Sequence, residues 1–204
     1  FRLRVYQSEL VGILTLSERE RAAIYRFLAG QADLKRADVW LHERRCTVGG
    51  HLDIRQLGIE CIDHQASLIS SLSVADNITI DGQVVPPLRL VRDRENYRHA
   101  EALLRTVGTL DLASLDTLAL AIFQRAVVRV CRALWKKARV ILLDDVFAEF
   151  TEKEKTTFLG ILRRLSADGI SFILLGHDSA ELISRTDRLV IVRNGRVAMT
   201  VDSA

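Results

Sequence analysis

The sequence predicts an α/β fold in which a mostly parallel β-sheet carries helices on both faces. Three observations support this prediction. Apolar runs such as Val140–Leu143 show no polar alternation, which is typical of strands buried on both faces of a parallel sheet. Segments with helical periodicity separate these runs along the chain. Near the C-terminus, Asn194-Gly195 lies between two apolar runs and predicts an antiparallel hairpin.

The N-terminal part is predicted to begin the α/β core. Leu10–Thr15 is predicted to be a buried strand, and residues 19–29 a helix with apolar residues at helical spacing. Residues 31–56 are polar and leave room for short strands. Gly58–Ile62 is predicted to be a further short strand.

Residues 67–128 differ in character and are predicted to form a helical subdomain. Helical periodicity runs over Tyr97–Val107 and again from about Leu115 to Leu134. The chain is therefore predicted to be one domain over residues 1–204, with its α/β core at 1–66 and 129–204.

The C-terminal third has the clearest element boundaries. Thr151 and Glu154 have the spacing of a capping box that opens a helix, and Gly169 is suited to end that helix. Ile170–Leu175 follows as a buried strand. The two hairpin strands are predicted at Leu189–Val192 and Arg196–Thr200.

The composition excludes several classes of protein. The chain has 204 residues, 49% hydrophobic and 27% charged, which suits a globular protein with a sizeable core. The net charge of +3 is small and no long basic tract occurs, so no nucleic-acid partner is predicted. The three cysteines lack the spacing of a metal site or disulfide framework, which favours a reducing cytosol. The apolar runs are too short for direct membrane insertion.

Polar residues follow the predicted strands at their carboxyl ends. Asp144 and Asp145 end one strand, Gln65 follows another, and His177 follows a third. The Leu10–Thr15 strand leads directly into a helix, which is where phosphate-binding loops lie. Open α/β sheets bind ligands at this edge, so these residues form the candidate site.

Taken in order, these features resemble the ATP-binding subunits of ABC transporters, most closely those of bacterial ribose- and galactose-type sugar importers. The resemblance covers essentially all 204 residues. Short motifs spread along the chain carry it: Glu9-Leu-Val-Gly12, His64-Gln65-Ala-Ser-Leu68, Leu72-Ser-Val-Ala-Asp-Asn-Ile78, Arg132-Ala-Leu134, the Asp144 strand, Thr151-Glu-Lys-Glu154, Gly176-His177, Asp187-Arg188 and Arg193-Asn-Gly-Arg196.

The resemblance implies a P-loop NTPase-like fold and a role for each candidate residue. In the family, the Asp at the strand end holds Mg²⁺ and the next acidic residue activates the attacking water. A His after the following strand contacts the γ-phosphate, and a Gln senses it. By position these roles would fall on Asp144, Asp145, His177 and Gln65.

The sequence departs from the family at the phosphate loop. The pattern G-x-x-x-x-G-K-[ST] uses glycines to wrap the phosphates, a Lys to neutralise them and a hydroxyl to bind Mg²⁺. Here Thr15 and Glu20 stand at the glycine positions, Arg21 at the Lys and Ala22 at the hydroxyl. Glu18 and Glu20 also place negative charge where a triphosphate would lie, which costs on the order of a few kcal/mol.

Several of these residues have a second interpretation. Arg21 could keep some nucleotide affinity, since Arg binds phosphate well. Alternatively, Ser17 and Glu20 form a capping box, and Glu18–Arg21 is the solvated first turn of an ordinary helix. Asp144 could bind the following turn, His177 the backbone, and Gln65 could be a surface or hinge residue.

The family signature Leu-Ser-Gly-Gly-Gln is also replaced, here by Leu120-Ala-Ile-Phe-Gln124. In the family this motif covers the γ-phosphate held on a partner subunit, whereas bulky Phe123 suits packing. Asp145 stands where the family has Glu and is one methylene shorter, which compromises its reach to a water molecule. Val146-Phe147 replaces the family's Pro-Thr.

The leading hypothesis is a degenerate cassette that does not hydrolyse ATP and has no cofactor. It would act as a regulatory, sensory or structural module in the cytoplasm, through another cassette, a permease or a fused regulatory domain. The alternative is a transporter subunit at the inner face of the membrane that keeps residual Mg-ATP binding and pairs with a competent ATPase. In that case Arg21, Gln65 and Asp144 would bind the nucleotide and metal, and Asp145 and His177 would be catalytic.

Overall fold

The computed structural model describes residues 3–31, 39–41, 44–46, 51–64, 67–80 and 93–202. The chain divides into two compact units. The core unit comprises residues 1–64, 138–145 and 162–204, and the helical unit comprises residues 65–137 and 146–161. The helical unit thus includes residues 129–137 and 146–161, which were predicted to belong to the α/β core.

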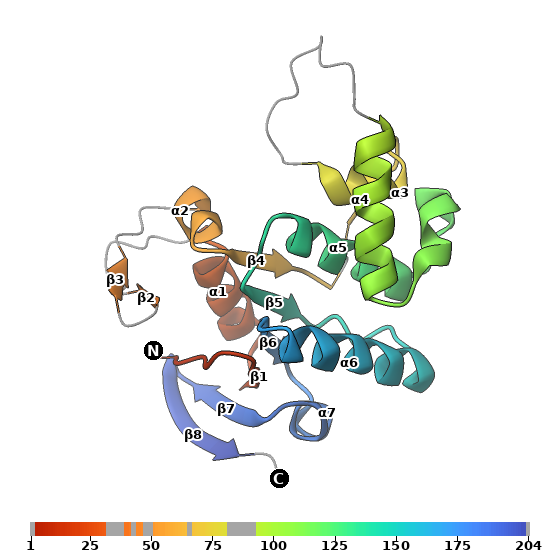
Figure 1. Cartoon of the computed structure of the whole chain (residues 1–204). Helices are drawn as coiled ribbons and strands as arrows, with labels where there is room; N and C mark the ends of the chain where they lie inside the picture. Colours follow the sequence, from red (N-terminus) through yellow and green to blue (C-terminus); the bar gives the residue numbers. More distant parts are fainter. Residues whose placement is uncertain are drawn as a thin grey trace. The chain divides into compact units, whose positions relative to one another are not determined.

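A six-stranded sheet forms the centre of the core unit and confirms the predicted α/β fold (Figure 1). Its strand order is β4-β5-β6-β1-β7-β8, parallel throughout except for β8, which is antiparallel to β7. The strands are β1 (Leu10–Thr15), β4 (Ile59–Ile62), β5 (Val140–Asp144), β6 (Ser171–Gly176), β7 (Arg188–Arg193) and β8 (Arg196–Asp202). All six were predicted: β1, β5 and β6 from unbroken apolar runs, β4 as a short strand, and β7 and β8 from the hairpin signal at Asn194-Gly195.

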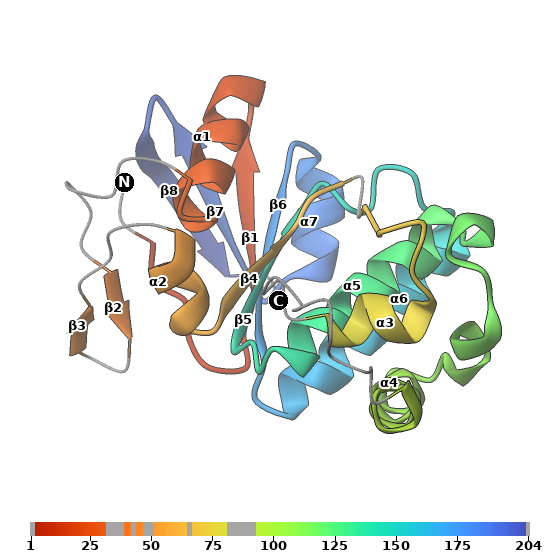
Figure 2. The same cartoon turned by 90° about the horizontal axis from the view of Figure 1, so that it is seen from above.

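Strand β1 lies between β6 and β7, and all six of its residues are buried. Helix α1 (Glu18–Leu28) covers one face of the sheet, where Ile24 packs with Val11 and Ile13. Helix α7 (Ser179–Arg185) covers the opposite face (Figure 2). Because both faces are covered, β1 needs apolar residues at successive positions rather than in alternation.

The polar segment between α1 and β4 contains a two-stranded antiparallel sheet and a short helix. The strands are β2 (Val39–Leu41) and β3 (Arg44–Cys46), and the helix is α2 (His51–Gln56). The short strands agree with the prediction that residues 31–56 could hold short strands, whereas α2 was not predicted.

The helical unit contains α3 (Val74–Thr79), α4 (Asp93–Thr106), the 3₁₀ turns η2 (Leu110–Ser114) and η3 (Thr117–Ala119), and α5 (Ile122–Trp135). The predicted start of a helix near Leu115 is wrong. The Asp116 carboxylate accepts a hydrogen bond from the Leu118 N–H and caps η3, so α5 begins only at Ile122. Among the described residues, no helix has both the length and the apolar character needed to cross a bilayer.

Local sequence signals set the ends of two C-terminal elements. Helix α6 (Glu152–Ala167) opens with the predicted capping box: the Thr151 N–H donates to Glu154 at 2.8 Å, and the Glu154 N–H donates to the Thr151 hydroxyl at 3.3 Å. Asn194 and Gly195 both have positive φ, 54° and 70°, as a type I′ hairpin turn requires.

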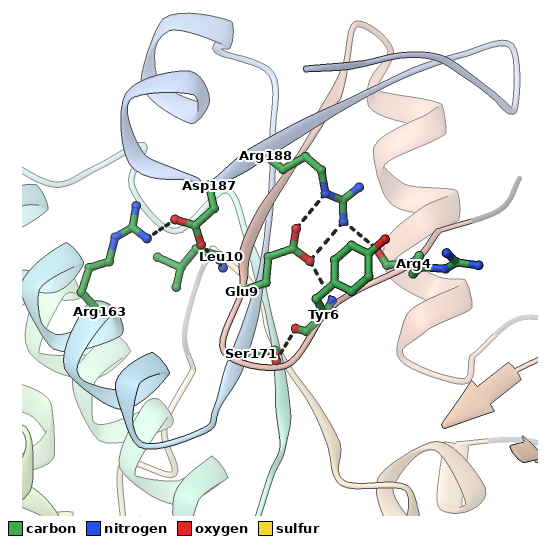
Figure 3. A network of polar contacts seen from close by, with 8 residues as sticks. All are labelled: Arg4, Tyr6, Glu9, Leu10, Arg163, Ser171, Asp187 and Arg188. Carbon is green, nitrogen blue, oxygen red and sulfur yellow. Dashed lines mark hydrogen bonds and ion pairs between the residues drawn. The ribbon is translucent and has the colours of Figure 1, made fainter. Parts of the chain in front are cut away.

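A polar network fixes the amino ends of β1 and β7 (Figure 3). The Arg188 guanidinium donates to Glu9 at 2.7 and 3.1 Å, and the Tyr6 N–H donates to the same carboxylate at 2.8 Å. The Asp187 carboxylate accepts from the Leu10 N–H at 2.8 Å. These charged groups therefore hold the sheet at the edge opposite to the candidate site.

Gly12 in β1 provides a test of this packing. A Cβ at Gly12 would lie 2.9 Å from Leu189 Cδ1 and 3.1 Å from Thr186 Oγ1. We expect Gly12→Ala to lower the free energy of unfolding by about 1–3 kcal/mol, the usual cost of overpacking. Chemical denaturation measures this change.

The matched control is Gly160→Ala in α6, where an added Cβ meets no atom within 4 Å. Alanine has the higher helix propensity, so this variant should be more stable by about 1 kcal/mol. Equal effects of the two substitutions would contradict the described packing of β1.

Candidate functional site

The sheet register brings the predicted site residues of the core unit to one edge. Asp144 ends β5 beside Leu175 of β6, and His177 follows directly after β6. On the other side of β6, Leu14 of β1 lies beside Gly176. Parallel pairing therefore places the start of α1, the two carboxylates and the histidine at the carboxyl edge of the sheet, as predicted. Gln65 lies outside the described residues.

The connection between β1 and α1 consists of two residues, Leu16 and Ser17. The helix is already formed at Glu18, and the Arg21 N–H donates to the Ser17 carbonyl at 3.0 Å. Ser17 makes no side-chain capping bond, so the predicted capping box of Ser17 and Glu20 is wrong. The stretch that corresponds to a phosphate loop is therefore largely helix.

Glu20 has a different partner from the one predicted. Its carboxylate accepts a hydrogen bond at 2.8 Å from the N–H of Gly195, in the turn between β7 and β8. The contact joins residues 175 positions apart in the chain, which local sequence patterns cannot reveal. It ties the β7–β8 hairpin to the first turn of α1.

Glu18 and Arg19 are exposed, as predicted for a solvated first turn, but Arg21 is buried, which corrects that prediction at this residue. Its Nη1 donates to Asp144 Oδ1 at 2.8 Å. Its Nε and Nη2 donate to the two oxygens of Glu18 at 3.0 and 2.6 Å. The guanidinium thus forms a two-bond pair with Glu18 and a buried ion pair with Asp144.

Burial and pairing act in opposite directions on this cluster. Burial raises the pKa of Asp144 above its ordinary value, and the positive charge of Arg21 opposes that rise. The hydrogen bond from Arg21 lowers the pKa of Glu18, and the same bond raises the pKa of Arg21. The Arg21 side chain therefore stays charged and offsets part of the cost of burying Asp144.

Asp145 has an uncommon backbone conformation. Its φ is 52°, in the left-handed region, and its N–H donates to the Leu175 carbonyl at 2.8 Å. Its carboxylate lies 3.7 Å from Arg21 Nη1 and 3.4 Å from His177 Nδ1. His177 has 66% of its side chain exposed, and its contact is with the Asp145 carboxylate. The alternative considered from the sequence was a bond from His177 to the backbone.

Three carboxylates, from Glu18, Asp144 and Asp145, therefore surround the single guanidinium of Arg21. With His177 neutral, the cluster carries an excess of two negative charges. In the part of the chain that the structure describes, no group of three or more His, Cys, Asp or Glu side chains has the geometry to hold a metal ion.

In the helical unit, the segment at the signature position forms the start of α5. Gln124 Oε1 accepts from the Ala121 N–H at 2.9 Å, and the Arg125 Nε donates to the Leu120 carbonyl at the same distance. Phe123 packs edge-on against Phe150 and Phe158, with ring centroids 5.6 and 6.2 Å apart. Phe123 thus belongs to an aromatic cluster, as its bulk predicted.

Solved structures show which fold the chain shares. The chain superposes on a nucleotide-free ATP-binding cassette from an ABC transporter with a TM-score of 0.85 and 16% identity, covering 99% of this chain and 83% of that one. It also superposes on cbiO1 from Clostridium perfringens, part of the ABC transporter complex cbiONQ, with a TM-score of 0.82, 17% identity and coverage of 98% and 80%. The chain therefore has the P-loop NTPase-like fold of ABC ATPase cassettes.

Curated relatives show which ABC cassettes this chain is similar to, although no family model matches. Ribose import ATP-binding protein RbsA of Clostridium tetani is 25% identical over 95% of this chain, and RbsA 1 of Rhizobium etli is 30% identical over 86%. Galactofuranose transporter ATP-binding protein YtfR of Escherichia coli is 27% identical over 93%. The chain is thus an ABC-type cassette homologous to sugar-import ATP-binding proteins. It spans 39%, 34% and 38% of the lengths of these three relatives.

The ion pair between Arg21 and Asp144 predicts a pH-dependent effect of substitution. In Arg21→Met, the Asp144 carboxylate stays buried without its cation, so we expect a loss of about 3–5 kcal/mol of unfolding free energy at neutral pH. Without Arg21 the pKa of Asp144 rises further in the folded state. A raised folded-state pKa means that stability falls as pH rises through it, so the deficit should shrink on acidification.

Denaturant titrations at several pH values measure this deficit. Arg26→Met, at an exposed arginine of the same helix, is the control and should change stability by less than about 0.5 kcal/mol. The double variant Arg21→Met with Asp144→Leu should recover most of the loss, since an apolar pair leaves no buried charge. A deficit that grows on acidification would contradict this account.

Proposed function

We propose that this cassette does not hydrolyse ATP and acts through protein contacts. The main support is that the Arg21 guanidinium is already hydrogen-bonded to two carboxylates. The residue at the phosphate-binding Lys position donates to Asp144 and Glu18, both within the same unit of the chain. A phosphate at this position would have to displace two carboxylates from the guanidinium. A divalent metal at Asp144 would have to displace Arg21.

The surroundings of Arg21 support the same proposal. A two-residue connection between β1 and α1 leaves little backbone with which to wrap a triphosphate, and the Arg21 N–H is already hydrogen-bonded within the helix. The excess carboxylate charge of Glu18, Asp144 and Asp145 repels an anion. Bound Mg-ATP would supply the phosphoryl group that is hydrolysed. The residues around Arg21 do not fit Mg-ATP.

A cassette of this kind would serve as a regulatory, sensory or structural module. Because its relatives are named as ATP-binding proteins of ribose and galactofuranose import, we propose that its partners come from a sugar-uptake system. The candidates are a second cassette, a permease or a regulatory domain of the same polypeptide. The module would then lie in the cytoplasm, at the inner face of the membrane when it is bound to a transporter.

The alternative function is that of a transporter subunit with residual nucleotide binding, paired with a competent ATPase. Its support is the location of Arg21, Asp144, Asp145 and His177 at the carboxyl edge of the sheet, where open α/β folds bind ligands. For this function Arg21 would have to leave Asp144 when the nucleotide arrives, with Gln65 joining the site. Asp144 would then hold the metal.

Thermal unfolding with and without Mg-ATP tests the proposal. A ligand at a hundredfold of its dissociation constant stabilises a protein by about 2.7 kcal/mol, a readily measured shift in Tm. We expect no shift for this chain. The comparison variant carries Thr15→Gly, Glu20→Gly, Arg21→Lys and Ala22→Ser, which restore the P-loop pattern. The Arg21→Lys change keeps the positive charge but removes the two-bond pair with Glu18.

Two results would decide between the functions. Mg-ATP turnover by the purified chain, abolished by Asp144→Ala, would overturn the proposal. A Tm shift with Mg-ATP that Arg21→Met removes, without turnover, would favour the subunit with residual binding. Arg26→Met, which lies outside the cluster, should leave either response unchanged.

A further inference from the structure

The two carboxylates that bind Arg21 differ in how firmly the fold holds them. The Asp144 side chain, at the end of β5, is 10% exposed and accepts from Arg21 Nη1. The Glu18 side chain, in the first turn of α1, is 75% exposed and accepts from Nε and Nη2. An exposed ion pair within one helical turn contributes little to stability, whereas breaking a buried pair costs far more. Glu18 is therefore the carboxylate that leaves Arg21 more easily.

The part of the guanidinium that Glu18 occupies has the geometry of an oxyanion site. Nε and Nη2 donate to the two Glu18 oxygens at 3.0 and 2.6 Å, which is the side-by-side arrangement with which arginine binds carboxylate and phosphate. Asp144 is bound through the other nitrogen, Nη1. Complete access to the guanidinium requires both carboxylates to leave, whereas access to Nε and Nη2 requires only Glu18 to leave.

Glu18 competes strongly with a free anion for these two donors. It belongs to the same helix as Arg21, so its effective concentration at the guanidinium is high. The hydrogen bond from Arg21 lowers the pKa of Glu18, so the carboxylate remains ionised at neutral pH. Its negative charge also repels an approaching anion. One side chain thus fills the donors and repels the ligand that would use them.

We propose that Glu18 is an autoinhibitory residue, which occupies Nε and Nη2 of Arg21 and excludes oxyanions from them. This role rests on the proposed function, in which the unmodified cassette does not use Mg-ATP. The excluded ligand is a small oxyanion such as inorganic phosphate. It binds without a metal ion once Glu18 is removed, because Asp144 keeps its bond to Arg21 and is not available to Mg²⁺.

Titration with inorganic phosphate, followed by NMR of the arginine Nε–H groups, tests the role of Glu18. In Glu18→Ala the Nε and Nη2 donors are vacant, so the Arg21 resonance should shift and phosphate should bind at least about tenfold more tightly than to the unmodified chain. The exposed Arg26 of the same helix is the internal reference and should shift equally little in both proteins. Glu18 is exposed and alanine favours helix, so the variant is expected to fold.

Glu20→Ala is the matched control. It removes the same charge from the same helical turn, but the Glu20 carboxylate accepts from the Gly195 N–H and not from Arg21. Nε and Nη2 then remain occupied, so this variant should respond to phosphate no more than the unmodified chain does. Glu18→Gln provides a second test, because its amide nitrogen cannot accept from arginine and the two-bond pair is lost. It should also bind phosphate more tightly than the unmodified chain.

Three results would overturn the role of Glu18. They are no phosphate response in either Glu18 variant, an equal response in Glu20→Ala, or a response of Glu18→Ala that requires Mg²⁺. The proposed function is tested separately, by Mg-ATP turnover of the unmodified chain. If the unmodified chain shows no turnover and the Glu18 variants bind no phosphate, the proposed function stands and only the role of Glu18 fails.

Discussion

The burial of strand β1 constrains the rest of the core unit. Its six residues are covered on both faces and paired in parallel on both edges, so every backbone polar group of the strand has to be satisfied within the sheet. Helix α1 begins two residues later and packs against the same strand through Ile24. This short connection brings Arg21 down to the carboxyl edge, where Asp144 lies at the end of β5. The buried ion pair is thus a consequence of how tightly α1 follows β1.

Several residues that depart from the ABC pattern have specific partners in the structure. Arg21 pairs with Asp144, Glu20 accepts from Gly195, and Phe123 packs against Phe150. Each replacement therefore takes part in an interaction of its own unit. These contacts are why Arg21 and Glu20 are not free to contact a phosphate in this structure.

The strands and the capped helix were predictable because their signals are local. An unbroken apolar run such as Val140–Leu143, or the spacing of Thr151 and Glu154, depends on near neighbours in the chain. The errors arose where distant groups compete with a local pattern. Glu20 has capping-box spacing from Ser17, yet the Gly195 N–H takes its carboxylate. Asp116 caps a separate 3₁₀ turn, so the periodic apolar residues after Leu115 did not form one helix.

The sequence by itself determined the fold, the edge of the sheet where the site lies and the kinds of residue that gather there. These follow from apolar patterning and from the order of motifs, which a linear chain displays. Only the tertiary structure decided what those residues do to one another. Arg21 and Asp144 are 123 positions apart, and nothing local distinguishes an arginine available to phosphate from one held by a buried carboxylate. The pairing is set by strand register and helix packing, which exist only once the chain has folded.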